Sequence, residues 1–161
     1  MQPAPIPTNE KQRLEALKAL GILDTKPDER FDAITKEAIK RLHVPISTVS
    51  LIDSEREWYL SRQGLGITEA KRETSFCGHA MFSEYIFIVE DTLKDPRFAD
   101  NPTVIGAPYI RFYAGIALRD HRHRLPVGVL CVKDTKPRSM TAQEVGILLE
   151  LAAKAETEIN T

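Results

Sequence analysis

The segment Ser75-Phe76-Cys77-Gly78-His79 brings a thiol and an imidazole close together in the chain. Thr74 or Ser75 can cap a short helix here, and a thiol in the first helical turn has its pKa lowered by the helix dipole. His79 is two residues from Cys77 and would point to another side of the helix, so the pair does not suit a nucleophile and its base. Because unpaired buried cysteine is usually an inert small hydrophobe, we predict no catalytic residue and no enzyme activity.

A second group of reactive side chains, Asp120, His121 and His123, lies in a charged stretch between two apolar runs. Zinc sites need three or four protein ligands at fixed spacing, and this stretch offers no such set. We therefore predict a solvated hairpin tip and no metal site. The sequence leaves the identity of any cofactor unknown.

The segment 63–110 is irregular and rich in Pro, Asp and Asn. Long ordered loops in compact domains are usually functional. If a small molecule binds, its polar contacts are expected from this region, including Arg97. Arg111 can form a bidentate hydrogen-bonded pair with a carboxylate or a phosphate. The alternative is that Asp91 and Asp95 cap turns while Arg97 and Arg111 pair with these acids to hold the loop. Our candidate ligand-binding residues are Phe76, Cys77, His79, Asp91, Phe98, Asn101, Arg111 and Tyr113.

The elements that would position these residues follow from hydrophobic periodicity and from start and stop signals. Residues 1–8 carry three prolines and are expected to be a flexible lead-in to a single domain at 9–161. Helices are predicted over 10–20, from Thr25-Lys26-Pro27-Asp28 to the residues before Pro45, near 78–82 and from Thr141 onward. Strands are predicted over 46–53, 58–62, 86–89, 111–118 and 127–134, with 53–57 as a turn.

The last helix carries apolar residues spaced three and four apart, as in a heptad seam. One interpretation is that this stripe packs on the sheet or on the first helix; the other is that it also binds a second copy of the chain. The candidate dimer-interface residues on the first and last helices are Leu14, Leu17, Val145, Leu148, Ala152, Ala155 and Ile159.

The composition of the 161-residue chain, with 42% hydrophobic and 28% charged residues, is typical of one globular domain. The formal net charge is −1 and basic residues are scattered, so nucleic acid is not an expected partner. Two cysteines are too few for a disulfide framework, and no signal peptide or membrane-spanning apolar run is present. The sequence predicts a cytoplasmic location and no membrane contact.

Several short strings, in this order, resemble the GAF family of bacterial signalling modules: Leu20-Gly21-Ile22-Leu23-Asp24-Thr25, Val44-Pro45-Ile46-Ser47-Thr48-Val49, Ser75-Phe76-Cys77-Gly78-His79-Ala80, Asp95-Pro96-Arg97-Phe98, Arg111-Phe112-Tyr113-Ala114-Gly115 and Gly128-Val129-Leu130-Cys131-Val132. The resemblance covers nearly the whole chain. It implies an α+β, GAF/PAS-like fold with an antiparallel sheet of five or six strands, terminal helices on one face and a pocket on the other.

The resemblance also implies a regulatory domain that senses an unidentified small molecule and couples it to helix packing and to a homodimer. The partner would be an attached or separate signalling output domain, either a kinase or a cyclic-dinucleotide cyclase or phosphodiesterase. One alternative is a ligand-free dimerisation module, favoured if the pocket is filled by the domain's own side chains. A second is a thiol-dependent enzyme of the free methionine sulfoxide reductase kind, for which Cys131, in mid-strand, gives Cys77 no evident resolving partner.

Some GAF proteins attach linear tetrapyrroles through a cysteine directly followed by histidine, and here Gly78 separates the two. The Asn-Lys-x-x-x-Phe-x-x-x-Asp-Glu pattern of cyclic-nucleotide-binding members is also absent. Neither ligand class is therefore indicated.

Overall fold

The computed structural model describes residues 1–161 and contains one six-stranded antiparallel sheet in the order β3-β2-β1-β6-β5-β4. The strands are β1 (Ile46–Ile52), β2 (Arg56–Gln63), β3 (Glu69–Lys71), β4 (Ile86–Val89), β5 (Phe112–Arg119) and β6 (Pro126–Asp134). The helices are α1 (Glu10–Ala19), α2 (Glu29–Leu42), α3 (Phe76–Ala80), α4 (Pro102–Ile105) and α5 (Ala142–Ile159), with single 3₁₀ turns η1 (Arg72–Thr74) and η2 (Thr92–Lys94). This architecture confirms the predicted α+β fold.

The central strands are buried on both faces because each face packs against other elements. On β1, Val49 and Leu51 join the core under the long helices, while Ile52 faces the smaller core on the other side. Thr48 and Ser50 are also buried and share that second side by alternation. The predicted assignment of alternate β1 residues to opposite faces of the sheet is therefore confirmed.

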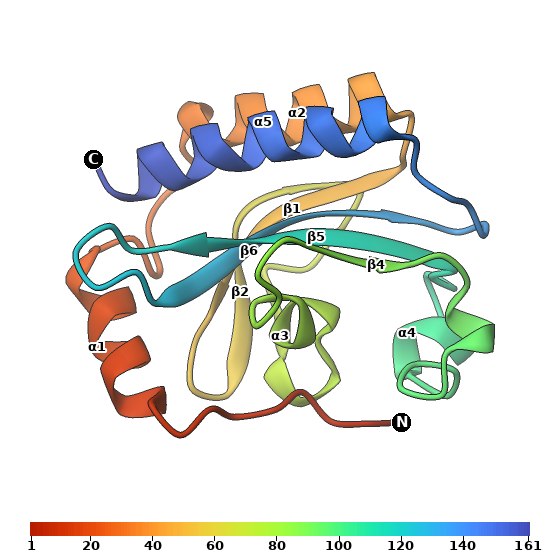
Figure 1. The fold of residues 1–161 in the computed structure, drawn as a ribbon, viewed down its shortest axis with the longest axis horizontal. Coiled ribbons are helices and arrows are strands. Elements are labelled where there is room, and N and C mark those ends of the chain that lie inside the picture. Colours follow the sequence, from red (N-terminus) through yellow and green to blue (C-terminus); the bar gives the residue numbers. More distant parts are fainter.

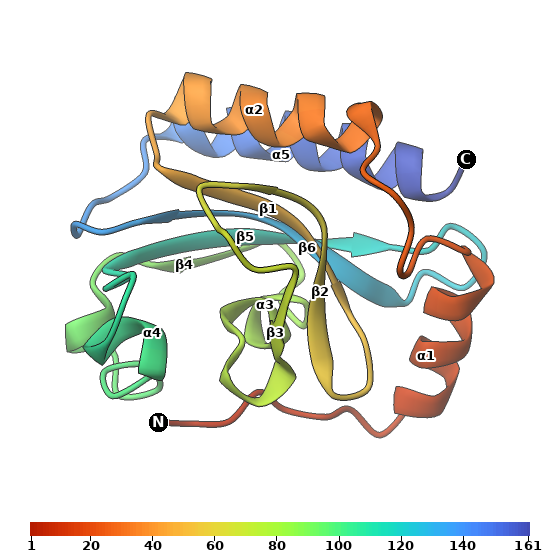
Figure 2. The same cartoon turned by 180° about the vertical axis from the view of Figure 1, so that it is seen from behind.

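Helices α2 and α5 lie side by side across one face of the sheet, and α3 and α4 lie under the opposite face (Figures 1 and 2). Helix α2 begins at Glu29, one residue after Asp28, whose carboxylate accepts a hydrogen bond from the Arg30 backbone. Pro27 therefore precedes the cap instead of sitting in the first turn, because Asp28 supplies the capping oxygen. A reciprocal capping box between Thr141 and Glu144 starts α5.

The apolar stripe predicted as a dimer seam is occupied by the domain's own core. Leu148, Ala152, Ala155 and Ile159 of α5 are buried on the sheet, and so is Leu17 of α1. Leu14 and Val145 are half-buried. A helix that covers a sheet needs the same apolar spacing as one that pairs with another helix, and here the sheet takes that face. Helix α1 lies at the end of the sheet, away from α2 (Figure 1).

Residues 1–8, expected to be a flexible lead-in, run along the lower side of α3 (Figures 1 and 2). The backbone amide of Gln2 donates to the Arg97 carbonyl, and that of Ala4 donates to the Glu73 carbonyl, both at 3.0 Å. The segment thus packs on the irregular region. None of the helices is long and apolar enough to cross a bilayer.

Candidate functional site

The face of the sheet opposite α2 and α5 carries an aromatic stack. The Phe76 ring lies 4.3 Å from the Phe98 ring and 5.2 Å from the Tyr113 ring, nearly parallel to both. All three side chains are buried, and Phe87 meets two of the rings edge-on. These predicted ligand-binding residues do come together, but they pack against one another and fill the space between sheet and α3.

Two cysteines meet beside this stack. Cys77 of α3 and Cys131 of β6 are both fully buried and belong to the same hydrophobic cluster. The Tyr113 hydroxyl donates to Cys77 Sγ at 3.0 Å, and Thr48 Oγ1 lies 3.1 Å from Cys131 Sγ. The fold therefore brings Cys131 into the same buried cluster as Cys77, although the local sequence pattern did not indicate a partner for Cys77.

The environment treats the two thiols differently. Burial raises the pKa of Cys77 well above its usual value, because a thiolate there would be poorly solvated. Burial also raises the pKa of Cys131, but the neighbouring Cys77 side chain and the positive charge of Lys133 lower it by more, so the net direction is downward.

A buried carboxylate and a buried ammonium flank the thiols. Glu57 of β2 accepts hydrogen bonds from the hydroxyls of Ser50 and Ser75, each at 2.6 Å. The Lys133 ammonium lies 5.9 Å from the centre of the Phe76 ring and 6.0 Å from that of Tyr113. Burial lowers the pKa of Lys133, but negative charge at Cys131 and Glu57 outweighs burial and raises it, which keeps the ammonium charged.

The polar residues predicted to contact a ligand hold the irregular segment instead. Asp91 caps η2 by accepting from the Leu93 amide, and Asn101 caps α4 while donating to the Thr74 carbonyl. Arg111 donates to the Val104 and Ile110 carbonyls, and Arg97 pairs with Asp95 at 2.7 Å. The structure thus gives these residues the capping and loop-holding contacts that we weighed as the alternative, except that Arg111 binds carbonyls and no acid.

His79 lies apart from the thiols. Its Nε2 atom is 3.1 Å from the Gln2 carbonyl oxygen, and its ring meets Phe98 edge-on. Burial lowers the pKa of His79, and the positive charge of Arg97 adds to the effect, while the Gln2 carbonyl opposes it. The imidazole therefore joins the N-terminal segment to the aromatic stack and does not activate Cys77.

The hairpin tip between β5 and β6 is organised by one carboxylate. Asp120 is buried and accepts from the backbone amides of His123 and Leu125. The His123 ring lies near Asp120, and the His121 ring lies 3.4 Å from Glu156 of α5. These contacts shape a turn.

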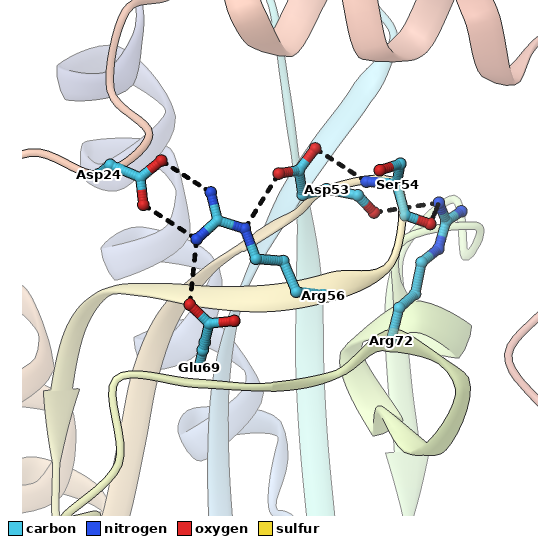
Figure 3. A network of polar contacts seen from close by, with 6 residues as sticks. All are labelled: Asp24, Asp53, Ser54, Arg56, Glu69 and Arg72. Carbon is cyan, nitrogen blue, oxygen red and sulfur yellow. Dashed lines mark hydrogen bonds and ion pairs between the residues drawn. The ribbon is translucent and has the colours of Figure 1, made fainter.

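Arg56 forms the centre of a partly exposed network at the start of β2 (Figure 3). It pairs with Asp24 of the α1–α2 connection, Asp53 of the β1–β2 turn and Glu69 of β3. In the same view Arg72 reaches the backbone carbonyls of Asp53 and Ser54. Arg72 also pairs with Glu10, which itself pairs with Arg13, so α1 is tied to the segment that leads into α3.

Arg138 connects the helix layer with the end of the sheet. Its guanidinium donates to the carboxylates of Asp134 and Glu144 and to the carbonyls of Leu42 and His43. Its backbone amide donates to the carbonyl of Glu90, just after β4. One residue thus links the end of α2, the start of α5 and the part of the irregular segment that follows β4.

Sequence reasoning missed part of this site, namely Thr48, Ser50, Glu57, Cys131 and Lys133. Alternation along β6 already puts Cys131 and Lys133 on one face of a buried strand, and a lysine in such a position was an available signal. Glu57 gave no such signal because it falls in a charged run that was predicted to be a turn.

The fold and these residues match a known family. The family model described as "GAF domain" matches residues 26–159. The chain belongs to the GAF domain family. A cyclic di-GMP phosphodiesterase of Pseudomonas aeruginosa is 38% identical to it over 154 residues, which cover 96% of the chain and 26% of that protein. This GAF domain is therefore homologous to a minor part of a longer signalling protein.

Solved structures place the domain in the same fold. The GAF domain of an Acinetobacter phosphoenolpyruvate-protein phosphotransferase superposes with a TM-score of 0.67 at 20% identity, covering 92% of each chain. A type II free methionine-R-sulfoxide reductase from Thermoplasma acidophilum gives 0.65 at 12% identity, covering 89% of this chain and 94% of that one. At these identities the likeness concerns the fold.

Proposed function

We propose that this GAF domain is a regulatory, non-catalytic module of a cytoplasmic signal-transduction protein and acts through its α2–α5 helix layer. The observation that carries the proposal is that the inner face of the sheet is filled by Phe76, Phe98, Tyr113 and the two cysteines. A filled inner face favours a module that works by association over one that holds a ready-made ligand site.

The output that the module regulates is, in this proposal, an attached domain that turns over cyclic di-GMP. The support is the relative from Pseudomonas aeruginosa, which is named as a cyclic di-GMP phosphodiesterase and is 38% identical over almost the whole of this chain. Because this chain covers 26% of that protein, the remaining length has room for an output domain.

The proposed partner of the helix layer is a second copy of the chain. A groove runs between α2 and α5, with Ala33 and Ala153 exposed along it. Small side chains allow helices to approach closely. The groove also carries Glu37 on α2 and Lys154 on α5, neither of which is ion-paired within the chain. Two copies related by a two-fold axis can place Lys154 of each opposite Glu37 of the other.

Signal transfer would follow the contacts of Arg138. Because this side chain touches the ends of both long helices and the end of the sheet, a change in the irregular segment can bias how α2 and α5 sit. A partner that binds one helix arrangement more tightly than another would then shift the output.

The test is the molar mass of the purified chain in solution, measured by light scattering over a concentration series. We expect a dimer for the unaltered chain and a monomer for Ala153→Arg, which puts a bulky charge into the groove. Ala19→Arg, the same change at an exposed site on α1, should remain dimeric. A monomeric unaltered chain, or a dimer that survives Ala153→Arg, would contradict the proposed interface.

A charge exchange sharpens the same test. Lys154→Glu should weaken the dimer because it brings two carboxylates together, and adding Glu37→Lys should restore it. If the double variant is no more dimeric than the single one, these two residues do not meet across the interface.

A second candidate function is small-molecule sensing at the inner face, with the ligand-binding residues predicted above. The observation that favours it is the Lys133 ammonium, which is buried yet forms no ion pair with a carboxylate. An anionic metabolite could pair with it if the aromatic stack moved. Native mass spectrometry of the purified chain, with thermal shifts against a panel of anionic metabolites, tests this: a retained compound or a raised melting temperature supports sensing. If no compound is retained and the melting temperature does not rise, small-molecule sensing is contradicted and the association module remains as the proposed function.

A further inference from the structure

Strand β4 forms one edge of the sheet, and its outer side is open (Figure 1). No backbone hydrogen bond joins β4 to any element other than β5. In an antiparallel strand, alternate residues direct their N–H and C=O groups away from the neighbouring strand, so part of the β4 backbone faces this open side. The opposite edge, β3, is three residues long and carries Glu69 and Lys71, which is how proteins commonly protect a sheet edge from pairing.

The side chains of β4 give no such protection. The run Tyr85-Ile86-Phe87-Ile88-Val89 contains no charged residue, proline or glycine. Ile86 and Ile88 pack on the core under the long helices, and Phe87 and Val89 pack on the core of the inner face. Ile86, Phe87 and Ile88 are nevertheless only half-buried, and Tyr85 is 77% exposed. Because both faces of the strand are occupied, what remains for a partner is the edge itself.

A second copy of β4 does not suit this edge. An antiparallel pair with Phe87 opposite Phe87 places Glu84 opposite Glu90 at both ends. The next register, with Phe87 opposite Ile88, places Glu84 opposite Asp91 at both ends. Like charges directly opposite each other destabilise a strand pair, and registers further out set carboxylates against apolar residues. The occupant is therefore a strand of different composition.

The charges beside β4 indicate that composition. Glu84 before the strand and Glu90 after it are both exposed and form no ion pair within the chain. A shallow hollow at the end of the strand carries three carboxylates and two cations, from Glu90, Asp91, Asp95, Lys94 and Arg97, which leaves a net charge of −1. Each end of the apolar edge is thus negatively charged, and a strand with basic ends complements it.

We propose that the open edge of β4 is a docking site for an extended segment of another polypeptide, apolar in its middle and with lysine or arginine at both ends. The segment would add to the sheet as a further strand, with backbone hydrogen bonds supplying affinity and the terminal ion pairs selecting the partner. Parallel and antiparallel segments both bring one basic end to Glu84 and the other to Glu90. The site is separate from the α2–α5 groove and goes beyond the proposed association of that helix layer.

The first experiment measures the binding of a labelled synthetic peptide to the purified chain by fluorescence anisotropy, up to millimolar concentration. The peptide alternates valine and threonine and has two lysines at each end. We expect saturable binding that weakens as salt is added. One control peptide has glutamates in place of the lysines, and another has proline in place of the central valine. Both should bind at least roughly tenfold more weakly. No binding of the lysine peptide, or equal binding of the proline peptide, would overturn the proposal.

Charge reversal tests the ends of the site. Glu84→Lys combined with Glu90→Lys should weaken binding of the lysine peptide roughly tenfold and strengthen binding of the glutamate peptide. Glu55→Lys combined with Glu73→Lys makes the same change of net charge at two exposed glutamates away from β4 and should leave binding unchanged. An equal loss in the two double variants would show that the peptide responds only to the overall charge of the domain, which contradicts a site at β4.

Hydrogen exchange locates the bound peptide. Its binding should slow exchange of backbone amides within Ile86–Val89, and protection confined to other elements would place the peptide elsewhere and overturn the proposal. Slow exchange of these amides without peptide, lost when the chain is diluted, would show that a second copy covers the edge and would overturn it as well. Dimerisation through α2 and α5 leaves the β4 edge open, so the two proposals fail separately.

Discussion

The Tyr113 hydroxyl donates a hydrogen bond of 3.0 Å to Cys77 Sγ, at a point closed to water. This contact ties β5 to α3 and places a polar group inside the aromatic stack. Burial raises the pKa of Tyr113 well above its usual value, so the phenol stays protonated and remains a donor. The inner face is thus both filled and internally hydrogen-bonded.

Removal of that donor should cost a measurable but modest amount of stability. Tyr113→Phe keeps the ring and loses one buried hydrogen bond, which typically contributes about 1 kcal/mol. The free energy of unfolding from a urea titration measures the loss. Tyr85→Phe, at an exposed tyrosine, should stay within about 0.5 kcal/mol of the unaltered chain. Equal effects at the two sites would mean that the Tyr113 hydroxyl contributes nothing.

Glu57 and Lys133 should prove energetically coupled although they are not in direct contact. Glu57 favours the charged form of Lys133 inside the site, and loss of either residue removes an opposite charge from the surroundings of the other. We expect Glu57→Gln and Lys133→Met each to cost roughly 2 kcal/mol, and the double variant to cost at least about 1 kcal/mol less than their sum. Strict additivity in this double-mutant cycle would contradict the coupling.

The layers of the fold could be predicted from the sequence because they follow from the local periodicity of hydrophobic residues. Val49 and Leu51 alternate with Thr48 and Ser50, and that alternation alone sorted the two faces of β1. Strand β3 was not predictable: it spans Glu69–Lys71, is largely exposed and exists through backbone pairing with β2. No hydrophobic pattern marks such a strand.

The site was less predictable, since its decisive contacts join residues far apart in the chain. The meeting of Cys77 with Cys131 depends on how α3 folds back under β6, which no local pattern encodes. The stripe on α5 shows the complementary difficulty. Ala152 and Ala155 have a spacing that suits a sheet and a partner helix equally well, and only the assembled core shows that the sheet takes them.

Arg138 should matter more for stability than its partial exposure suggests. Arg138→Ala removes hydrogen bonds to Asp134, Glu144 and two helix-end carbonyls, so we expect a loss of roughly 2–3 kcal/mol in the free energy of unfolding. Arg122→Ala, at an exposed arginine without an ion pair, is the control and should change little. A loss no greater than that of the control would show that the Arg138 contacts are replaced by water without cost.

His79 should make stability depend on pH. Its folded-state pKa is lowered, chiefly by burial, so the unfolded chain binds the proton more tightly. The contribution of neutral His79 is complete above its ordinary pKa of 6.5 and decreases as pH falls through that value towards the folded pKa. Unfolding free energies measured between about pH 5 and 8 should therefore rise with pH more steeply in the unaltered chain than in His79→Asn. Identical slopes would contradict the assignment.

Gly78 lets the N-terminal segment lie against α3. A Cβ atom built on Gly78 would approach the Ala4 Cβ to 2.7 Å, which is closer than such atoms pack, so Gly78→Ala should displace the segment. Since alanine also favours a helix by roughly 1 kcal/mol over glycine, the melting temperature should change little while the Ala4 amide exchanges faster with solvent. Adding Ala4→Gly removes the clash and should restore its protection. If Gly78→Ala alone leaves exchange at residue 4 unchanged, the packing of residues 1–8 on α3 does not persist in solution.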